Sequence, residues 1–374
     1  MADLFDYLKW RGDVPFTVDP FNEVDNLVLA ELAYAHLDGI ITGSFDRVPL
    51  REVDEKYFED HSREDAVRDG SHIVRSALLM DGMLSGKRFG SVKLMRYVNT
   101  VNADKDMQMA ALTFLLPDGS VYISFRGTDS TVVGWKEDLN MSYMPVTEGQ
   151  RSAVRYLNET AARLRRPIRV GGHSKGGNFA VFASAFCEPK IRDRIVAVYT
   201  NDGPGFRRET RASAEYRSIL PKVVSIVPDT SIIGMLLTNE VRHRIVKSNE
   251  KGISQHDALS WQIERNRFVS AEQSALGQFI SRSQQDWLSK IDDESRALFV
   301  DTVFSVIEST GMDTFGEMEN NKLISVERML NSIKGLSRER QKEIMSIFGE
   351  LVQSSTQAAR SAISDMDIRG WKNE

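Results

Sequence analysis

The chain has 374 residues and a formal net charge of -5, and its 41% hydrophobic and 27% charged residues are typical of a soluble globular protein. This length fits one large domain or two ordinary ones, and the charge provides no broad basic face for nucleic acid. The single cysteine, the scattered histidines and the lack of a signal-like or membrane-length apolar run lead us to expect a cytoplasmic protein without disulfide, metal, cofactor or transmembrane segment.

The first third of the chain is predicted to be helical before a hairpin appears. Apolar residues recur at helical spacing over 22–37 and again, mixed with charges, over 50–85. Two β-rich runs within 107–128 flank the turn sequence Pro-Asp-Gly-Ser at 117–120, which predicts a β-hairpin.

From residue 148 onward, helical and strand patterns alternate, which is typical of crossover units that build a parallel sheet. The expected helices and strands, in chain order, lie at 148–164, 168–171, 175–186, 194–200, 207–218, 222–227 and 242–248. After about residue 270 the strand signal ends and the rest is charge-rich and helical. We therefore expect an α/β domain over 1–270, with the helices of 1–90 packed on it, and a helical extension over 271–374.

The segment "RVGGHSKGGNF" carries a G-x-S-x-G motif centred on Ser174, between a strand pattern and a helix pattern. That context is typical of a nucleophile elbow, a strained turn that exposes the serine hydroxyl, and the flanking glycines remove side chains that would collide there. The alternative is a purely structural turn. At the start of the helix, the backbone N–H of Lys175 can stabilise a developing oxyanion. We expect His173 to shape the pocket or to pack beneath the elbow.

A second oxyanion donor is expected at the end of the strand "VYISFRGT". Thr128 follows that strand and offers both a backbone N–H and a hydroxyl. The alternative is that Thr128 only starts a helix at a plain strand end.

The segments "FRGT", "GWKEDLN" and "GGHSKGG", in this order, resemble the class 3, or fungal-type, lipases of the α/β-hydrolase superfamily. The chain also resembles an uncharacterised bacterial, Mbeg-like family related to those lipases, which shares the segments "KWRGD", "PFNEVDN", "NDGPGF" and "QHD…SW". The resemblance implies the α/β-hydrolase fold, with a mostly parallel central sheet flanked by helices. It also implies a serine–histidine–acid triad in the chain order nucleophile, acid, histidine.

Two histidines follow Ser174 at a suitable distance, and we expect His256 to be the general base. It lies in the polar loop "NEKGISQHDALSW" after the last predicted strand, where an imidazole can reach over the serine. His243 lies inside an alternating strand pattern, where its neighbours would be those of a sheet.

The acid is left open between Asp202 and Asp229, with Asp202 favoured. Asp229 follows the second strand after the elbow, but the alignment with the lipase pattern puts Ser231 where the carboxylate normally stands. Asp202 follows the preceding strand, within "NDGPGF", and could reach the same imidazole. Asp257 is disfavoured because adjacent side chains on extended backbone point apart.

These residues predict a serine hydrolase that cleaves carboxylic esters through an acyl-enzyme, with a small ester or acyl lipid as substrate. The alternatives are an acyltransferase that uses the same triad, or a noncatalytic binding or scaffold protein with this fold. The sequence does not identify substrate-binding residues, and it is compatible with a homo-oligomer.

Overall fold

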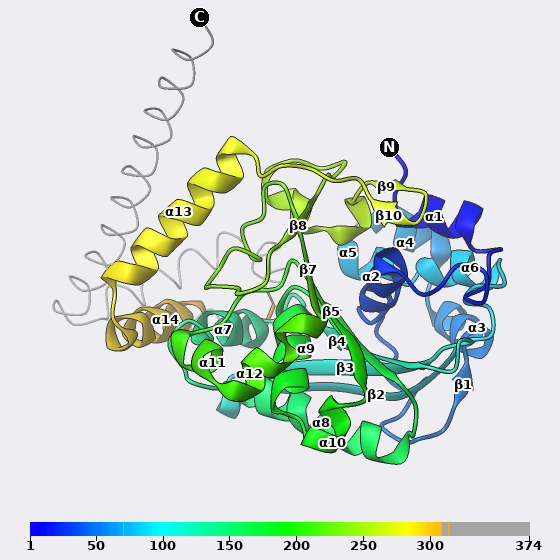
Figure 1. Ribbon diagram of the computed structural model, residues 1–374, viewed down its shortest axis with the longest axis horizontal. Coiled ribbons are helices and arrows are strands. Elements are labelled where there is room, and N and C mark those ends of the chain that lie inside the picture. The colour runs from blue at the N-terminus through cyan, green and yellow to red at the C-terminus, as the bar shows by residue number, and fades with distance from the viewer. Residues whose placement is uncertain (70, 309–312, 315–374) are drawn as a thin grey trace, which may run out of the picture.

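The computed structural model describes residues 1–69, 71–308 and 313–314, and its centre is an eight-stranded sheet whose strands lie in chain order (Figure 1). The strands are β1 (Val48–Pro49), β2 (Lys93–Asn102), β3 (Met107–Leu115), β4 (Val121–Arg126), β5 (Ile168–His173), β6 (Ile195–Asn201), β7 (Val223–Pro228) and β8 (Arg244–Val246). A short antiparallel pair, β9 (Ile263–Glu264) and β10 (Arg267–Phe268), lies outside this sheet.

The sheet has an antiparallel half and a parallel half. Neighbouring strands from β1 to β4 run antiparallel, whereas those from β4 to β8 run parallel. The predicted hairpin is confirmed as β3 and β4, and the predicted parallel strands are confirmed as β5 to β8. Because parallel strands end at the same edge of a sheet, the segments after β4, β5, β6 and β7 lie near one another.

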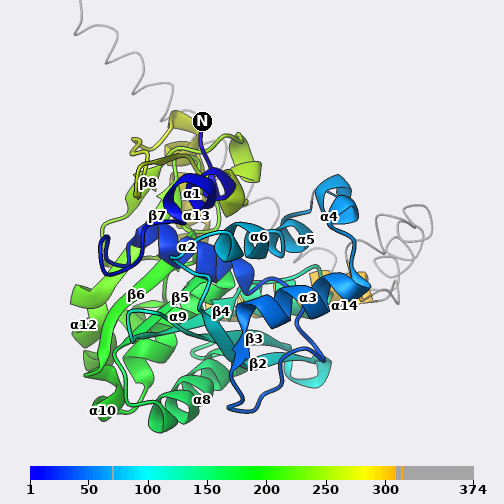
Figure 2. The same cartoon turned by 90° about the vertical axis from the view of Figure 1, so that its right-hand side faces the viewer.

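Alternation along the central strands separates two hydrophobic layers. Tyr122 of β4 belongs to a core shared with the N-terminal helices, while Ile123 and Phe125 belong to a core on the opposite face. Figure 2 shows the N-terminal helices on one side of the sheet and the later helices on the other. The later set comprises α8 (Glu148–Arg163), α9 (Lys175–Phe186), α10 (Pro189–Arg192), α11 (Arg208–Ala212) and α12 (Ala214–Ile219).

The N-terminal side is built from α1 (Leu4–Arg11), α2 (Glu23–Leu32), α3 (Leu50–Asp60), α4 (Arg63–Asp69), α5 (His72–Ser76) and α6 (Leu79–Leu84). The single helix predicted over 22–37 ends at Leu32, and the helical pattern over 50–85 is divided among four helices. Asn22 caps α2 by accepting hydrogen bonds from the backbone N–H groups of Val24 and Asp25. This cap fixes the start of the helix that packs directly on β4 and β5.

Three further helices complete the described part of the chain. The helix α7 (Val132–Asn140) follows β4, whereas α13 (Ala275–Lys290) and α14 (Asp293–Glu308) fall within the expected C-terminal extension. Val132 of α7 packs against Val300, Phe304 and Ile307 of α14. Most of the expected extension, from 315 to 374, lies outside the described residues, so its boundary near residue 270 stays a prediction. Within the described part of the chain, no helix has the length and apolarity needed to cross a bilayer.

Candidate active site

Ser174 occupies a sharp turn between β5 and α9. Its backbone φ is 57° and ψ is -134°, an unfavourable region for a residue with a side chain. A Cβ atom on Gly176 would lie 2.0 Å from the Phe125 carbonyl oxygen, and one on Gly172 would lie 2.4 Å from the Gly176 backbone. Only glycine fits at either position, so the expected elbow is present with both of its steric requirements met.

His256 and Asp202 meet at the carboxyl edge of the sheet, near the elbow. His256 Nδ1 lies 2.7 Å from Asp202 Oδ2. Asp202 follows β6, has a φ of 49° and is fully buried, while 29% of the His256 side chain is exposed. The second carboxylate oxygen of Asp202 accepts hydrogen bonds from Ser231 Oγ and from the Gly234 backbone N–H. Such an arrangement fixes the orientation and the tautomer of the imidazole.

The other candidates for the acid and for the base have different hydrogen-bond or ion-pair partners. Asp229 Oδ1 accepts hydrogen bonds from Thr230 Oγ1 and Gln255 Nε2 at 2.9 and 3.0 Å. His243 lies just before β8 instead of inside a strand, and its Nδ1 is 2.8 Å from the hydroxyl of Ser225 on β7. Asp257 pairs with Arg75 at 3.5 Å. Of the acids considered, the structure therefore brings Asp202 to His256.

Ser174 and His256 line one cavity of about 150 Å³. The remaining lining residues are Tyr34, His72, Thr128, Trp135, Asp138, His173, Ile233 and Asp257. Within the described part of the chain, no hydrogen bond joins the Ser174 hydroxyl to the His256 imidazole. Hydrogen bonds of this kind are often long before a substrate binds. The shared cavity is what allows the two side chains to act on one molecule.

The hydroxyl of Thr128 points to Asp138 of α7, donating a hydrogen bond to its Oδ2 at 2.5 Å. We expected both the hydroxyl and the backbone N–H of Thr128 to serve as oxyanion donors. Because the hydroxyl proton is used by Asp138, the backbone N–H is the donor that Thr128 retains. Burial raises the pKa of Asp138 to about 6, opposed by the nearby Lys175 cation and the Thr128 hydrogen bond.

Lys175 extends from the elbow into a buried ion pair with α7. Its Nζ lies 3.4 Å from Glu137 Oε2 and donates to the Gly134 carbonyl at 3.2 Å. Glu137 also accepts hydrogen bonds from the backbone N–H groups of Gln108 and Gly149. These contacts join α7 to the elbow through a buried ion pair. The sequence motif indicates a role for the Lys175 backbone alone and does not predict the ion pair of its side chain.

His173 lies beneath the elbow, as expected, and is 1% exposed. Its Nε2 donates to the His256 carbonyl at 2.8 Å, and its Nδ1 lies 2.9 Å from the Tyr34 hydroxyl. Burial holds the pKa of His173 well below its usual range, with His256 and His72 adding to the effect, so the ring is neutral. His173 thereby anchors the loop that carries His256.

Tyr34 and His72 are cavity residues that the sequence did not suggest. Each lies on an N-terminal helix or just after one, more than 90 positions before the elbow, and nothing in their local pattern marks them. Only the packing of that helical layer over β5 brings them to the serine.

Comparison with known proteins returns lipases among the solved structures. M37 lipase is 14% identical with a TM-score of 0.34, covering 56% of this chain and 68% of its own. The Rhizomucor miehei lipase–propeptide complex is 16% identical with a TM-score of 0.35, and the match covers 56% of this chain and 74% of that one. A fungal lipase–inhibitor complex is 16% identical with a TM-score of 0.35, and the match covers 60% of this chain and 77% of that one. A search of curated proteins found no significant match.

The family comparison agrees with the architecture. The chain has the α/β-hydrolase fold, with a sheet that is parallel from β4 to β8, helices on both faces and a serine at the turn from β5 to α9. The sequence model of the Mbeg1-like family matches residues 83–305, which is more than half of the chain. The resemblance drawn from the sequence motifs is confirmed: the chain belongs to the Mbeg1-like family.

Proposed function

We propose that this protein is a serine hydrolase that cleaves carboxylic esters, with Ser174 as nucleophile, His256 as general base and Asp202 as the acid. The observation that carries the proposal is the 2.7 Å contact between Asp202 and His256, beside a serine in a strained elbow that lines the same cavity. Three segments distant in the chain converge where parallel strands end, which is the usual position of a site in such sheets.

The first half of the reaction forms an acyl-enzyme. Ser174 Oγ attacks the ester carbonyl carbon while His256 Nε2 accepts the hydroxyl proton, and the C=O π electrons move to the oxygen. Asp202 stabilises the resulting imidazolium through Nδ1. When the tetrahedral intermediate collapses, the C–O bond to the leaving alcohol breaks and His256 returns its proton to that oxygen.

The negative oxygen of the intermediate is stabilised by backbone donors. In this proposal they are the N–H of Lys175, at the start of α9, and the N–H of Thr128. Removing one donor of this kind typically raises the barrier by about 3 kcal/mol. Asp138 assists indirectly, because it holds the Thr128 side chain and thereby orients the peptide group beside it.

The second half of the reaction replaces the alcohol with water. His256 removes a proton from water, the hydroxide attacks the acyl carbon, and Ser174 leaves with the returned proton. The acid is then released. Both halves use the same two donors and the same base.

The surroundings of the serine favour an acyl group over a highly charged substrate. Ile233 and Trp135 line the cavity with Ser174, and an adjoining cavity of about 520 Å³ shares His72, Thr128 and Trp135 and adds Ile73. Trp135 is 44% exposed, so it can contact an apolar chain without displacing core residues. A small ester or acyl lipid fits this lining.

A fluorophosphonate probe tests the proposal directly, because it labels only activated serines. We expect the wild-type chain to be labelled and to hydrolyse short p-nitrophenyl esters. The Ser174→Ala variant should lose labelling and about 10⁴-fold to 10⁶-fold of kcat, whereas the exposed Ser218→Ala should behave as wild type. Labelling that persists in Ser174→Ala, or a wild type that neither reacts nor hydrolyses any ester, would contradict the assignment.

A further inference from the structure

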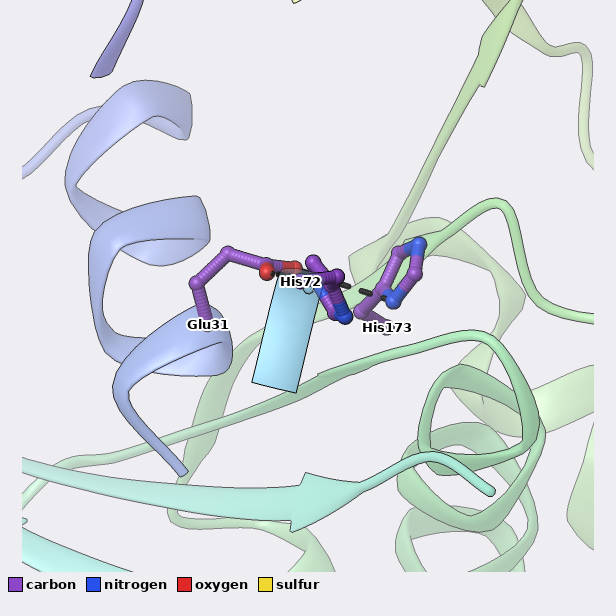
Figure 3. A group of neighbouring side chains, drawn as sticks. All are labelled: Glu31, His72 and His173. Carbon is purple, nitrogen blue, oxygen red and sulfur yellow. Dashed lines mark hydrogen bonds and ion pairs between the residues drawn. The ribbon is translucent and has the colours of Figure 1, made fainter. Parts of the chain in front are cut away.

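Three potential metal ligands from distant parts of the chain meet beside the candidate active site. Figure 3 shows Glu31 on α2, His72 on α5 and His173 at the end of β5 with their side chains directed toward one another. Their ligand atoms all lie within 4.8 Å of one another. The serine mechanism proposed above uses neither Glu31 nor His72.

Glu31 is a carboxylate with incomplete compensation. It is fully buried, and one of its oxygens, Oε2, contacts His72 Nε2. The other, Oε1, has no hydrogen-bond partner within the described residues. A buried carboxylate oxygen without a donor costs free energy, so an orphan of this kind indicates a missing hydrogen-bond donor or cation.

His173 presents a lone pair to that orphan oxygen. Because its Nε2 donates to the His256 carbonyl, the neutral ring has no proton on Nδ1, which accepts a hydrogen bond from the Tyr34 hydroxyl. His173 Nδ1 lies 3.7 Å from Glu31 Oε1. Two electron-rich atoms therefore face each other in a buried place, an arrangement that a cation between them would stabilise.

We propose that Glu31, His72 and His173 form a binding site for a divalent transition-metal ion, with Zn²⁺ as the best match. Two imidazoles and one carboxylate suit zinc and its first-row neighbours, which bind such ligands at about 2.0–2.2 Å. Ligand atoms around a tetrahedral ion are then about 3.3 Å apart, so shifts on the order of 1 Å close the site. The Tyr34 hydroxyl, which occupies the lone pair of His173, must move aside.

The proposed metal would connect three elements of the molecule, two helices of the N-terminal layer and one strand of the sheet. It would join α2 and α5 to the strand that leads into the elbow, and a metal on Nδ1 would strengthen the hydrogen bond from Nε2 to the His256 carbonyl. The proposal does not rest on the proposed ester hydrolysis, because a catalytically inactive Ser174→Ala chain should bind the metal as wild type does.

Isothermal titration of the untagged full chain with Zn²⁺ tests the site. We expect one ion per chain, and His72→Ala and Glu31→Gln should each weaken binding by about tenfold or more. His61→Ala, which removes an exposed histidine outside the cluster, should leave the affinity unchanged. Replacing zinc by Co²⁺ should give visible absorption bands that are lost in His72→Ala.

Tyr34→Phe separates a metal site from a simple hydrogen-bond network. It removes the donor that competes for His173 Nδ1, so zinc should bind at least as tightly as in wild type, and several-fold tighter if the competition is strong. The proposal is overturned if wild type binds no stoichiometric zinc at micromolar concentration. It is equally overturned if His72→Ala binds as wild type does, or if Tyr34→Phe weakens binding as much as His72→Ala.

Discussion

Asp25 and Asp202 are both fully buried carboxylates with several hydrogen-bond partners, yet their settings differ. Asp25, in the N-terminal helical layer, pairs with Arg88, whose side chain is also fully buried, and accepts a hydrogen bond from Tyr7 at 2.8 Å. Asp202, at the carboxyl edge of the sheet, pairs with the partly exposed imidazole of His256.

The difference lies in what each partner can do. An arginine does not release its proton in a protein, and Arg88 has no access to solvent, so the pair with Asp25 can only hold the fold together. An imidazole can accept and return a proton during a reaction, and His256 lines a cavity with a strained serine. A buried carboxylate alone therefore does not indicate a catalytic site. Its partner must also reach a cavity and be able to gain and lose a proton.

The largest effect expected from this comparison is on catalysis. Asp202→Asn should lower kcat for a p-nitrophenyl ester by about 10⁴-fold, because the amide favours the wrong tautomer of His256. Its amide is nearly the same size as the carboxylate, so the circular dichroism spectrum should be unchanged.

Asp229→Asn is the matched control, since it alters the acid that follows the next strand and faces Gln255 instead of His256. We expect its kcat to stay within about threefold of wild type. A larger loss in Asp229→Asn than in Asp202→Asn would reverse the assignment of the acid.

The next effect is on stability alone. Arg88→Met leaves Asp25 buried without its cation and should lower the free energy of unfolding by about 3–5 kcal/mol, measured by urea denaturation. The folded fraction should keep the wild-type kcat. Arg68→Met removes a mostly exposed ion pair with Asp65 and should change stability by less than about 1 kcal/mol. If Arg88→Met lost activity while remaining stable, the two carboxylates would not differ as argued.

Sequence patterns predict the parallel half of the molecule well, because the local helix and strand patterns there agree with the tertiary packing. The helix expected at 175–186 is α9, and the strand expected at 168–171 is the first part of β5. Around Ser174, tight packing of strand, turn and helix leaves glycine as the only choice, so the motif encodes its own geometry.

The antiparallel half was harder to predict. β2, with the sequence "KLMRYVNTVN", was missed because its alternation is broken by a register shift between Met95 and Val98, where Arg96 has a φ of 57°. The sequence does not decide between Asp202 and Asp229 as the acid, since both follow parallel strands and a pattern does not fix side-chain direction. The cluster of Glu31, His72 and His173 depends on three distant segments, which no local pattern relates.

Asp138 is a third carboxylate, whose setting lies between those of Asp25 and Asp202. It gives a pH-dependent test of the comparison. Its Oδ2 accepts a hydrogen bond from the Thr128 hydroxyl, and its Oδ1 lies 4.0 Å from the Lys175 ammonium. Burial raises its pKa to about 6, above the usual range, so folding disfavours the ionised form.

The sign of the pH dependence follows from proton binding. Between about pH 4 and pH 6 the folded chain binds more protons at Asp138 than the unfolded chain does, so the stability contributed by this group falls as the pH rises. Asp138→Asn lacks that dependence. We therefore expect the stability of the variant relative to wild type to improve by about 2 kcal/mol between about pH 4.5 and pH 7.5, measured by urea unfolding. A difference that stays constant over this range would mean that folding does not raise the pKa of Asp138, because the Lys175 cation and the Thr128 hydroxyl offset its burial.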